Sequence, residues 1–293
     1  MVTAPGLPAA SHEGPFPLIL RLIRRIGSAA TRIRGDLAYS LSKRPSRKYD
    51  FRLSISDIAQ RFSTPDEQWA YFHNFFWHLA PVWLRDHREF FRVDKRGFGE
   101  DAIHAMWYLL VSEVRPTSFL EIGVYRGQVL SLVKLIAHHE SFECSVLGIS
   151  PFSPVGDSVS EYGNFDYERD VREFCRRFGT PLAQHELLRA LSADEAAVEA
   201  IRNRKWDIGY IDGSHEYEIA RRDFDLVSSS LSQSGLLVLD DAGLYSGYRP
   251  KSFSFAGHAG PSRILEQETK RGAQIVVQAG HNVVLRPKSK AVM

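Results

Sequence analysis

The sequence predicts an α/β protein with a doubly wound, mostly parallel seven-stranded sheet, an antiparallel C-terminal hairpin and a helical N-terminal region. Three observations predict this class. After Pro116, short apolar runs alternate with segments of helical periodicity, as in parallel sheets whose strands are joined by helices. Two apolar runs flank Ala279-Gly280, which is the signal of a hairpin. Before Pro116, apolar residues recur at helical spacing.

Each expected strand is a short apolar run; the runs span residues 118–122, 145–149, 183–188, 206–211, 235–239, 273–278 and 281–286. Helices are expected between them over 128–138, 166–178, 193–203 and 216–231, with a last one over 261–271 before the hairpin. Because a hairpin follows the parallel strands, we expect one antiparallel strand at the edge of the sheet.

The chain divides into three regions: a flexible tail and basic amphipathic arm over 1–50, a helical cap region over 51–115 and the α/β domain over 116–293. Ser63-Thr-Pro-Asp-Glu67 combines a hydroxyl cap, a proline and acids in the first turn, and predicts a helix start. Nine aromatic residues from Trp69 to Phe91 at helical spacing indicate core packing or a subunit interface, and hence a homo-oligomer, rather than a ligand pocket. Another helix is expected from Gly99 to Glu113.

The basic charge of the chain belongs to the arm. Ten lysines and arginines lie between Pro15 and Arg52 against two aspartates, which makes this segment +8, whereas the whole chain is +2. Over residues 18–41 apolar and basic residues mix at helical spacing, and Leu18, Leu22, Ile26 and Ile33 are expected to share one face. Such a helix either packs on its own domain, or makes a peripheral membrane contact, or meets a partner subunit or nucleic acid.

Composition excludes several classes of protein. Cys144 and Cys175 are too few for a disulfide framework or a zinc site, which favours a reducing, cytoplasmic setting. No apolar run approaches the length of a membrane span, and the short run at Phe16–Leu20 has no basic residue before it, which speaks against a secretory signal.

The first expected strand ends in Glu121-Ile-Gly-Val-Tyr-Arg-Gly127, directly before a helix. Ligands of doubly wound sheets bind outside the carboxyl ends of the strands, at such a turn. Gly123 would let the backbone approach a ligand, and Gly127 would let the helix start close to the strand. The spacing G-x-x-x-G differs from the G-x-G-x-x-G that holds a pyrophosphate, so an NAD-dependent enzyme does not fit. An acid here suits the positively charged methionine end of S-adenosylmethionine.

Further polar residues follow two later strands. Asp212 and His215 come directly after the strand at 206–211, and Asp240 and Asp241 after the strand at 235–239. Because the carboxyl ends of parallel strands meet at one edge of a sheet, these four side chains are expected near the Glu121–Gly127 turn. An aspartate after a strand is often only a turn or cap residue. Three acids and one histidine at one edge are harder to explain in that way.

With these motifs the sequence resembles class I S-adenosylmethionine-dependent methyltransferases, in particular the small-molecule O-methyltransferase branch. The resemblance covers roughly residues 99–284. Within this branch, the sequence is similar to macrocin-type sugar O-methyltransferases. It implies a Rossmann-like fold and an enzyme that transfers a methyl group to a hydroxyl of a sugar or secondary metabolite. It also implies that Asp212, Asp240 and Asp241 hold a divalent cation such as Mg²⁺, for which carboxylate oxygens are suitable ligands.

The resemblance implies cofactor contacts by side chains or backbone at six positions besides Asp212: Glu121, Gly123, Tyr125, Gly127, Ser150 and Ser192. The family usually ends its second strand in an acid that binds the ribose hydroxyls, whereas this chain has Ser150 there. A serine cannot grip a diol as a carboxylate does, so Asp157 or another nearby acid would have to substitute. Ser192 lies where the family contacts the adenine.

Asp212 and His215 are the expected catalytic residues. Where the family has a second acid in the loop after the fourth strand, this chain has Ser214, and His215 follows it. We therefore expect His215 to act as the general base, because the ordinary pKa of histidine is near 6.5. His258 and the aromatic, basic loop from Tyr245 to Gly260 are expected either to cover the acceptor as a lid or to form a plain surface loop.

Two rival functions stay open at this point. Ser150 and the aromatic helices favour a catalytically degenerate member of the fold that serves as a binding or scaffold subunit. The basic arm is compatible with an RNA methyltransferase, but the body of the chain is acidic and no Asn/Asp-Pro-Pro-aromatic motif occurs, which speaks against a nucleic-acid substrate.

Overall fold

The computed structural model describes residues 31–44, 49–159 and 162–288 of the 293-residue chain. The chain forms two compact units, Met1–Arg44 and Pro45–Met293. In the first unit, residues 31–42 are helical, in agreement with the C-terminal part of the helix expected over 18–41. Leu18, Leu22 and Ile26 of its expected apolar face lie outside the described residues, and Ile33, the fourth residue of that face, is exposed.

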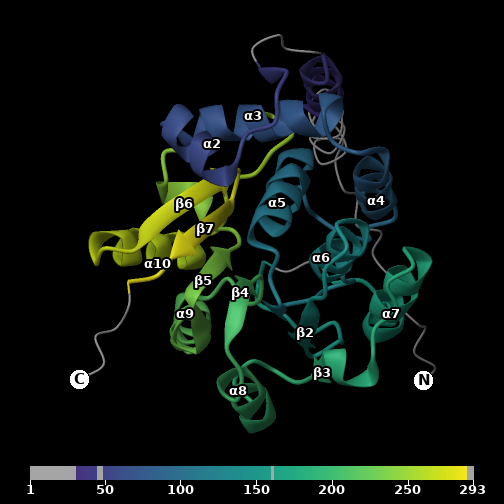
Figure 1. The fold of residues 1–293 in the computed structure, drawn as a ribbon, viewed down its shortest axis with the longest axis vertical. Coiled ribbons are helices and arrows are strands. Elements are labelled where there is room, and N and C mark those ends of the chain that lie inside the picture. The colour runs from purple at the N-terminus through teal and green to yellow at the C-terminus, as the bar shows by residue number, and fades with distance from the viewer. Residues whose placement is uncertain (1–30, 45–48, 160–161, 289–293) are drawn as a thin grey trace, which may run out of the picture. The chain divides into compact units, whose positions relative to one another are not determined.

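The second unit is built around a seven-stranded sheet with the order β3-β2-β1-β4-β5-β7-β6 (Figure 1). The strands in chain order are β1 (Ser118–Ile122), β2 (Ser145–Ser150), β3 (Leu187–Arg189), β4 (Trp206–Ile211), β5 (Leu231–Leu239), β6 (Gln274–Ala279) and β7 (Asn282–Arg286). Strands β1 to β5 are paired in parallel, and β7 runs antiparallel to both β5 and β6. The predicted fold class is confirmed.

The antiparallel strand does not lie where we expected it. β7 is inserted between β5 and β6, so β6 and not β7 is the edge strand. β7 pairs with Leu237–Leu239 of β5 on one side and with β6 along its whole length on the other. β6 begins with the exposed Gln274 and Ile275, which an edge position tolerates.

Helices cover both faces of the sheet (Figure 1). On one face the core is shared by α2 (Ile55–Arg61), α3 (Pro65–His78), α4 (Val82–Arg92), α5 (Asp101–Val114), α6 (Gln128–His139) and α7 (Tyr167–Arg177). On the other face it is shared by α8 (Glu195–Arg202), α9 (Tyr217–Ser230) and α10 (Ala259–Lys270). Alternate strand residues serve the two faces: Phe119 lies in the first core and Leu120 in the second.

The expected start of α3 is confirmed. Thr64 is its N-cap, forms a reciprocal capping box with Glu67, and is followed by Pro65. The aromatic side chains of α3 mostly point into the core; buried ones are Trp69, Tyr71, Phe72, Phe75 and Phe76. Core packing therefore accounts for this cluster, and the homo-oligomer expected from it stays a prediction.

Two strands differ in extent from the sequence-based expectation. The segment expected as a strand over 183–188 is a 3₁₀ turn at Gln184–Glu186 followed by the short β3. β5 begins four residues earlier than expected, at Leu231, which pairs with Trp206 across an irregular register. Both differences concern residues whose apolar pattern is weak, so that pairing with a neighbour decides the assignment.

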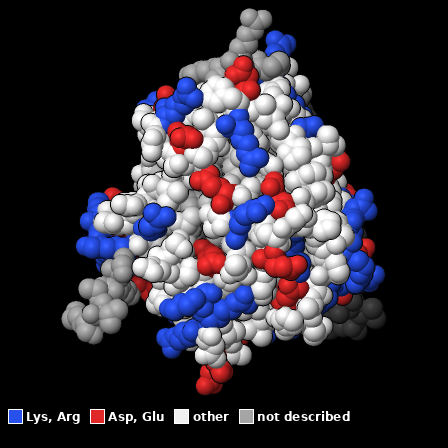
Figure 2. Space-filling model, viewed as in Figure 1, with Lys and Arg blue, Asp and Glu red and all other residues white. Residues whose placement is uncertain are grey.

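Two surface properties follow from the described residues. Among them, every helix is too short or too polar to cross a bilayer. On the face seen in Figure 2, acidic and basic side chains are interspersed over much of the surface.

Asp207 fastens the amino-terminal edge of the sheet, away from the loops at its carboxyl edge. Its Oδ2 accepts hydrogen bonds from the amide and the hydroxyl of Thr117, each at 2.8 Å, and its Oδ1 accepts one from Ser232 at 2.8 Å. Partial burial alone would raise the pKa of Asp207, but these hydrogen bonds outweigh it and lower the pKa.

We expect Asp207→Asn to lower the free energy of unfolding at pH 7 by about 1–2 kcal/mol, because charge-assisted hydrogen bonds are lost. A carboxyl whose pKa is lowered by folding stabilises above its unfolded pKa of about 3.9 and loses that contribution as the pH falls below it. The difference from wild type, measured by urea unfolding, should therefore shrink below about pH 4. Asp86→Asn, at an exposed position on α4, is the matched control and should change little at either pH.

Candidate active site

A cavity of about 1060 Å³ opens at the carboxyl edge of the sheet. Its walls come from the turns after β1, β2, β4 and β5, from the start of α5 and from the loop before α10. Of the residues expected in the site, it is lined by Glu121, Gly123, Tyr125, Ser150, Ser192, Asp212, His215, Asp240 and Asp241. Only Gly127 of the expected set is not part of the lining.

The two glycines of the first turn are required for different reasons. Gly123 has a φ of +92°, and a Cβ there would lie 1.9 Å from the carbonyl oxygen of Asp212. It therefore lets the turn after β1 pack directly against the turn after β4. Gly127 has a φ of +82°, and a Cβ there would lie 2.9 Å from Val171 on α7. The close approach at Gly127 is thus to α7 and not, as expected, to the strand.

Glu121 is buried beneath this turn, at 2% exposure. Among the described residues its Oε2 has no hydrogen-bond partner, although the side chain lines the cavity. Burial, and after it the negative charge of Asp240, raises the pKa of Glu121 well above its ordinary value. A buried carboxyl oxygen that faces a cavity without a partner is suited to a polar or cationic ligand group.

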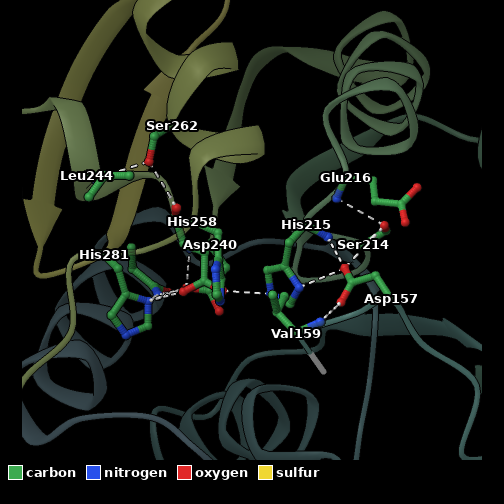
Figure 3. A network of polar contacts seen from close by, with 12 residues as sticks. Asp157, Val159, Ser214, His215, Glu216, Asp240, Leu244, His258, Ser262 and His281 are labelled. Carbon is green, nitrogen blue, oxygen red and sulfur yellow. Dashed lines mark hydrogen bonds and ion pairs between the residues drawn. The ribbon is translucent and has the colours of Figure 1, made fainter. Parts of the chain in front are cut away.

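Asp240 and Asp241 follow β5 and are held by the residues around them (Figure 3). One oxygen of Asp240 accepts the hydroxyl of Tyr210 at 2.9 Å. The other lies 2.7 Å from Nδ1 of His281 and also accepts the side-chain amide of Asn282. Both carboxylate oxygens of Asp240 therefore contact neighbouring side chains, from β4 and from the β6–β7 hairpin.

Asp241 adopts a left-handed backbone conformation, with a φ of +53°, which is uncommon for a residue other than glycine although aspartate tolerates it better than most. Its Oδ1 lies 3.2 Å from Nδ1 of His281, and its Oδ2 lies 2.8 Å from Nε2 of His215. Nε2 of His258 is 3.8 Å from the same Oδ2. Although burial alone would raise it, the two closer histidines hold the pKa of Asp241 below its ordinary value.

His215 is placed between two carboxylates. Its Nδ1 lies 2.9 Å from Oδ2 of Asp157, and its Nε2 faces Asp241. Asp157 also accepts the backbone N–H of His215, so the ring orientation is fixed from the β2 side (Figure 3). Burial lowers the pKa of His215, but the two carboxylates outweigh burial and raise it. His258, in contrast, does not lie between two close carboxylates of the described residues, and burial lowers its pKa.

Asp212 completes the group of acids expected at this edge. Burial, followed by the neighbouring charge of Asp240 and a hydrogen bond with it, raises the pKa of Asp212 well above its ordinary value. The structure therefore brings Asp212 next to Asp240, while Asp241 is turned toward the histidines. Whether these groups act in catalysis or bind a metal stays a prediction.

The residues expected at the ribose and adenine end lie on the other side of the cavity. Ser150 ends β2 and is half-buried. Asp157, considered above as a substitute for the missing acid, is directed at His215 instead. Ser192 donates to Asp223 at 3.0 Å and accepts from Arg222 at 3.1 Å. These serines line the cavity, and their cofactor contacts stay predictions.

Two contacts in this site were not predicted from the sequence. His281 lies in the turn of the hairpin, yet it contacts both Asp240 and Asp241. The antiparallel pairing of β7 with β5 explains this, because β7 begins at the edge where β5 ends. A hairpin turn that carries a histidine could have signalled it. Asp157 as the partner of His215 had no such signal, because the loop after β2 has no regular structure.

The loop before α10 forms one wall of the cavity through Phe253, Ser254, Phe255 and His258. It is fastened by Glu100, whose carboxylate accepts the hydroxyl of Ser254 at 2.7 Å and the amide of Phe255 at 3.1 Å. Glu100 also accepts the indole N–H of Trp69. The helices before β1 therefore help to position this wall.

Comparison with known proteins agrees with this architecture. Residues 120–242 match a family model described as a methyltransferase domain. A methyltransferase from Podospora anserina, solved with S-adenosylhomocysteine, superimposes with a TM-score of 0.50 at 13% identity, covering 82% of this chain and 99% of its own. A caffeoyl-CoA O-methyltransferase candidate from Staphylococcus aureus does so with a TM-score of 0.51 at 13% identity, covering 75% and 98%.

At this identity the structural likeness establishes the fold alone. A search of curated protein sequences found no match. The matched segment runs from β1 through the acid pair after β5 and so contains the turns that build most of the cavity. Residues 120–242 are therefore similar to a methyltransferase domain, and the chain has the fold of these solved methyltransferases, with its cavity at the carboxyl edge of the sheet.

Proposed function

We propose that this protein transfers the methyl group of S-adenosylmethionine to a hydroxyl of a small molecule, such as a sugar or a secondary metabolite. One observation carries the proposal: a single cavity joins the turn at Glu121–Gly127 to the cluster of Asp212, His215 and Asp241. The first is suited to the cationic cofactor, and the second to the acceptor hydroxyl. The Podospora anserina methyltransferase, which has a similar fold and was solved with S-adenosylhomocysteine, supports the choice of cofactor.

We expect the cofactor to bind in this cavity in one direction. Its positively charged methionine end would lie at Glu121, whose unpartnered buried oxygen can accept a hydrogen bond from an ammonium group. The ribose would then lie at Ser150 and the adenine near Ser192, both on the lining. Because Asp157 is directed at His215, the diol would be bound without a carboxylate from the loop after β2, so we expect modest affinity.

The acceptor would enter on the side of His215, His258 and the aromatic wall of Phe253 and Phe255. The walls around the reacting position are both apolar and acidic, as is suitable for a ligand with an apolar body and hydroxyl groups. Holding the hydroxyl in line with the methyl group is the main contribution that such a cavity can make.

The family resemblance implies a magnesium ion on Asp212, Asp240 and Asp241. In this structure both oxygens of Asp240 are engaged by Tyr210, His281 and Asn282. An octahedral oxygen site would have to displace these donors, so the three aspartates do not fit Mg²⁺ as they are arranged here. We derive no step through such an ion.

Direct proton removal by His215 also stays a prediction. A general base must present a free nitrogen lone pair to the hydroxyl. Nε2 of His215 faces Asp241 at 2.8 Å, and the acceptor would have to take the place of that contact. Whether or not His215 removes the proton, His215 and Asp241 lie in contact at the position where we expect the acceptor hydroxyl.

One alternative function is favoured by a specific observation. With Ser150 at the end of β2 and Asp157 directed elsewhere, no described carboxylate serves the ribose in the usual way. A domain of this kind could keep the fold and bind a ligand or partner without transferring a methyl group. Cofactor binding separates the two functions, because a degenerate scaffold has no need of it.

We expect the purified protein to bind S-adenosylhomocysteine, measured by titration calorimetry, and Glu121→Ala to weaken this binding at least about 10-fold, because a charge-assisted hydrogen bond is worth roughly 1.5–3 kcal/mol. Glu218→Ala, at an exposed position on α9, is the matched control and should leave the affinity unchanged. Absence of binding by the wild-type protein would refute the enzymatic proposal and leave the scaffold alternative.

We expect His215→Gln to reduce methyl transfer by about 100-fold or more, because the group nearest to the acceptor proton is lost. The measurement uses radiolabelled S-adenosylmethionine and a hydroxylated acceptor found by screening sugars and glycosides. The affinity for S-adenosylhomocysteine should stay within about 3-fold, a free-energy change of less than 1 kcal/mol. His185→Gln, at an exposed position, is the control. Unchanged turnover in His215→Gln would remove this residue from the reacting centre.

A further inference from the structure

His215, His258 and Asp241 converge from three different segments of the chain. His215 follows β4, Asp241 follows β5, and His258 is the N-cap of α10. One ligand atom from each of the three lies within 4.8 Å of the others. All three side chains line the cavity.

The separations suit the first coordination sphere of a small metal ion. Nε2 of His215 and Nε2 of His258 lie 2.8 Å and 3.8 Å from Oδ2 of Asp241. Metal bonds of about 2.0–2.2 Å in tetrahedral geometry place neighbouring ligand atoms about 3.3 Å apart. Each separation therefore needs to change by only about 0.5 Å to reach that value. The imidazole rings lie 4.2 Å apart between centroids and are inclined by 57°, so they do not stack flat against each other.

The next shell of residues is also of the kind found around metal ligands. Histidine ligands commonly give their second ring nitrogen to a carboxylate, which fixes the orientation of the ring. Nδ1 of His215 faces Oδ2 of Asp157 at 2.9 Å, and Asp157 holds the backbone N–H of His215 as well. Nε2 is thereby directed at Asp241, and the ring of His258 lies beside the ring of His215.

The donor atoms select the kind of ion. Two imidazole nitrogens and one carboxylate oxygen suit borderline ions of the first transition row, whereas Mg²⁺ prefers oxygen ligands alone. A second histidine-containing group, Asp240 with Asp241 and His281, is also compact. There, however, Asp240 is already engaged by Tyr210, His281 and Asn282, so this group is a less suitable site.

We propose that His215, His258 and Asp241 bind a divalent first-row transition ion, such as Zn²⁺, at the acceptor end of the cavity. That the ion polarises the acceptor hydroxyl rests on the proposed function, whereas the site itself rests on the three ligands and Asp157. The ion and direct base catalysis by His215 exclude each other, because both use the lone pair of Nε2.

The test uses Co²⁺ as a spectroscopic substitute for Zn²⁺. The full-length protein is stripped with a chelator and titrated with Co²⁺, and the visible absorption of the bound ion is recorded. We expect one equivalent to bind with the spectrum of a four- or five-coordinate nitrogen–oxygen site, to be displaced by Zn²⁺, and to resist about a 100-fold excess of Mg²⁺. Spectra need no methyl acceptor, so the readout is independent of activity.

Variants assign the ligands. His258→Ala should weaken Co²⁺ binding more than 10-fold, and Asp157→Asn about 10–100-fold, as is typical when the partner of a histidine ligand is lost. His185→Ala should have no effect. Binding of Co²⁺ by His258→Ala with unchanged affinity and spectrum would overturn the proposal, as would loss of binding in Asp212→Asn but not in His258→Ala, which would assign the oxygen set.

Cofactor binding is measured on the same samples so that the two proposals can fail separately. Each variant is titrated with S-adenosylhomocysteine, and we expect His258→Ala to bind it as the wild type does, which also shows that the cavity is folded. Cofactor binding without any Co²⁺ binding refutes the metal site alone. Co²⁺ binding at the three ligands without cofactor binding refutes the proposed function and leaves the metal site standing.

Discussion

The site depends on one electrostatic constraint, the neutralisation of the acid pair at the end of β5. Two adjacent carboxylates in a cavity cannot remain ionised without partners, because like charges and low solvation both oppose it. Asp240 is compensated by His281 and Asp241 by His215, while the pKa of Asp212 is raised beside Asp240. Any account of the chemistry has to say how this balance changes when cofactor and acceptor bind.

The same constraint connects segments that are far apart in the chain. His281 comes from the hairpin turn and is brought to the pair because β7 is inserted beside β5. His215 is itself held by Asp157, so the loop after β2 and the turn after β4 are joined by one chain of contacts. The loop before α10 adds His258 and is fastened through Glu100 to the start of α5. The family resemblance implies that the acid pair is part of a set of oxygen ligands. In this structure histidines surround the pair instead, and this difference is the physical basis of the metal site that we infer.

Much of the fold was predictable, because it is encoded in local periodicity. The helices and strands from Thr117 onward were expected within a few residues of their bounds, and the hairpin was recognised from Ala279-Gly280. The position of β7 was not predictable in the same way, since both hairpin strands are apolar and only pairing with β5 decides which one is inner. The role of Gly127 shows the same limit: its positive φ is a local property, but its neighbour Val171 belongs to another helix.

By itself the sequence determined the class of fold, the edge of the sheet that carries the site, and the convergence there of Glu121, Asp212, His215 and the acid pair. It could do so because parallel strands end at a common edge, so that residues placed after them must meet. Only the tertiary structure decided which of these groups face each other. Hydrogen-bond partners such as Asp157 and His281 come from loops and turns, whose paths depend on packing with distant parts of the chain and not on any period in the sequence.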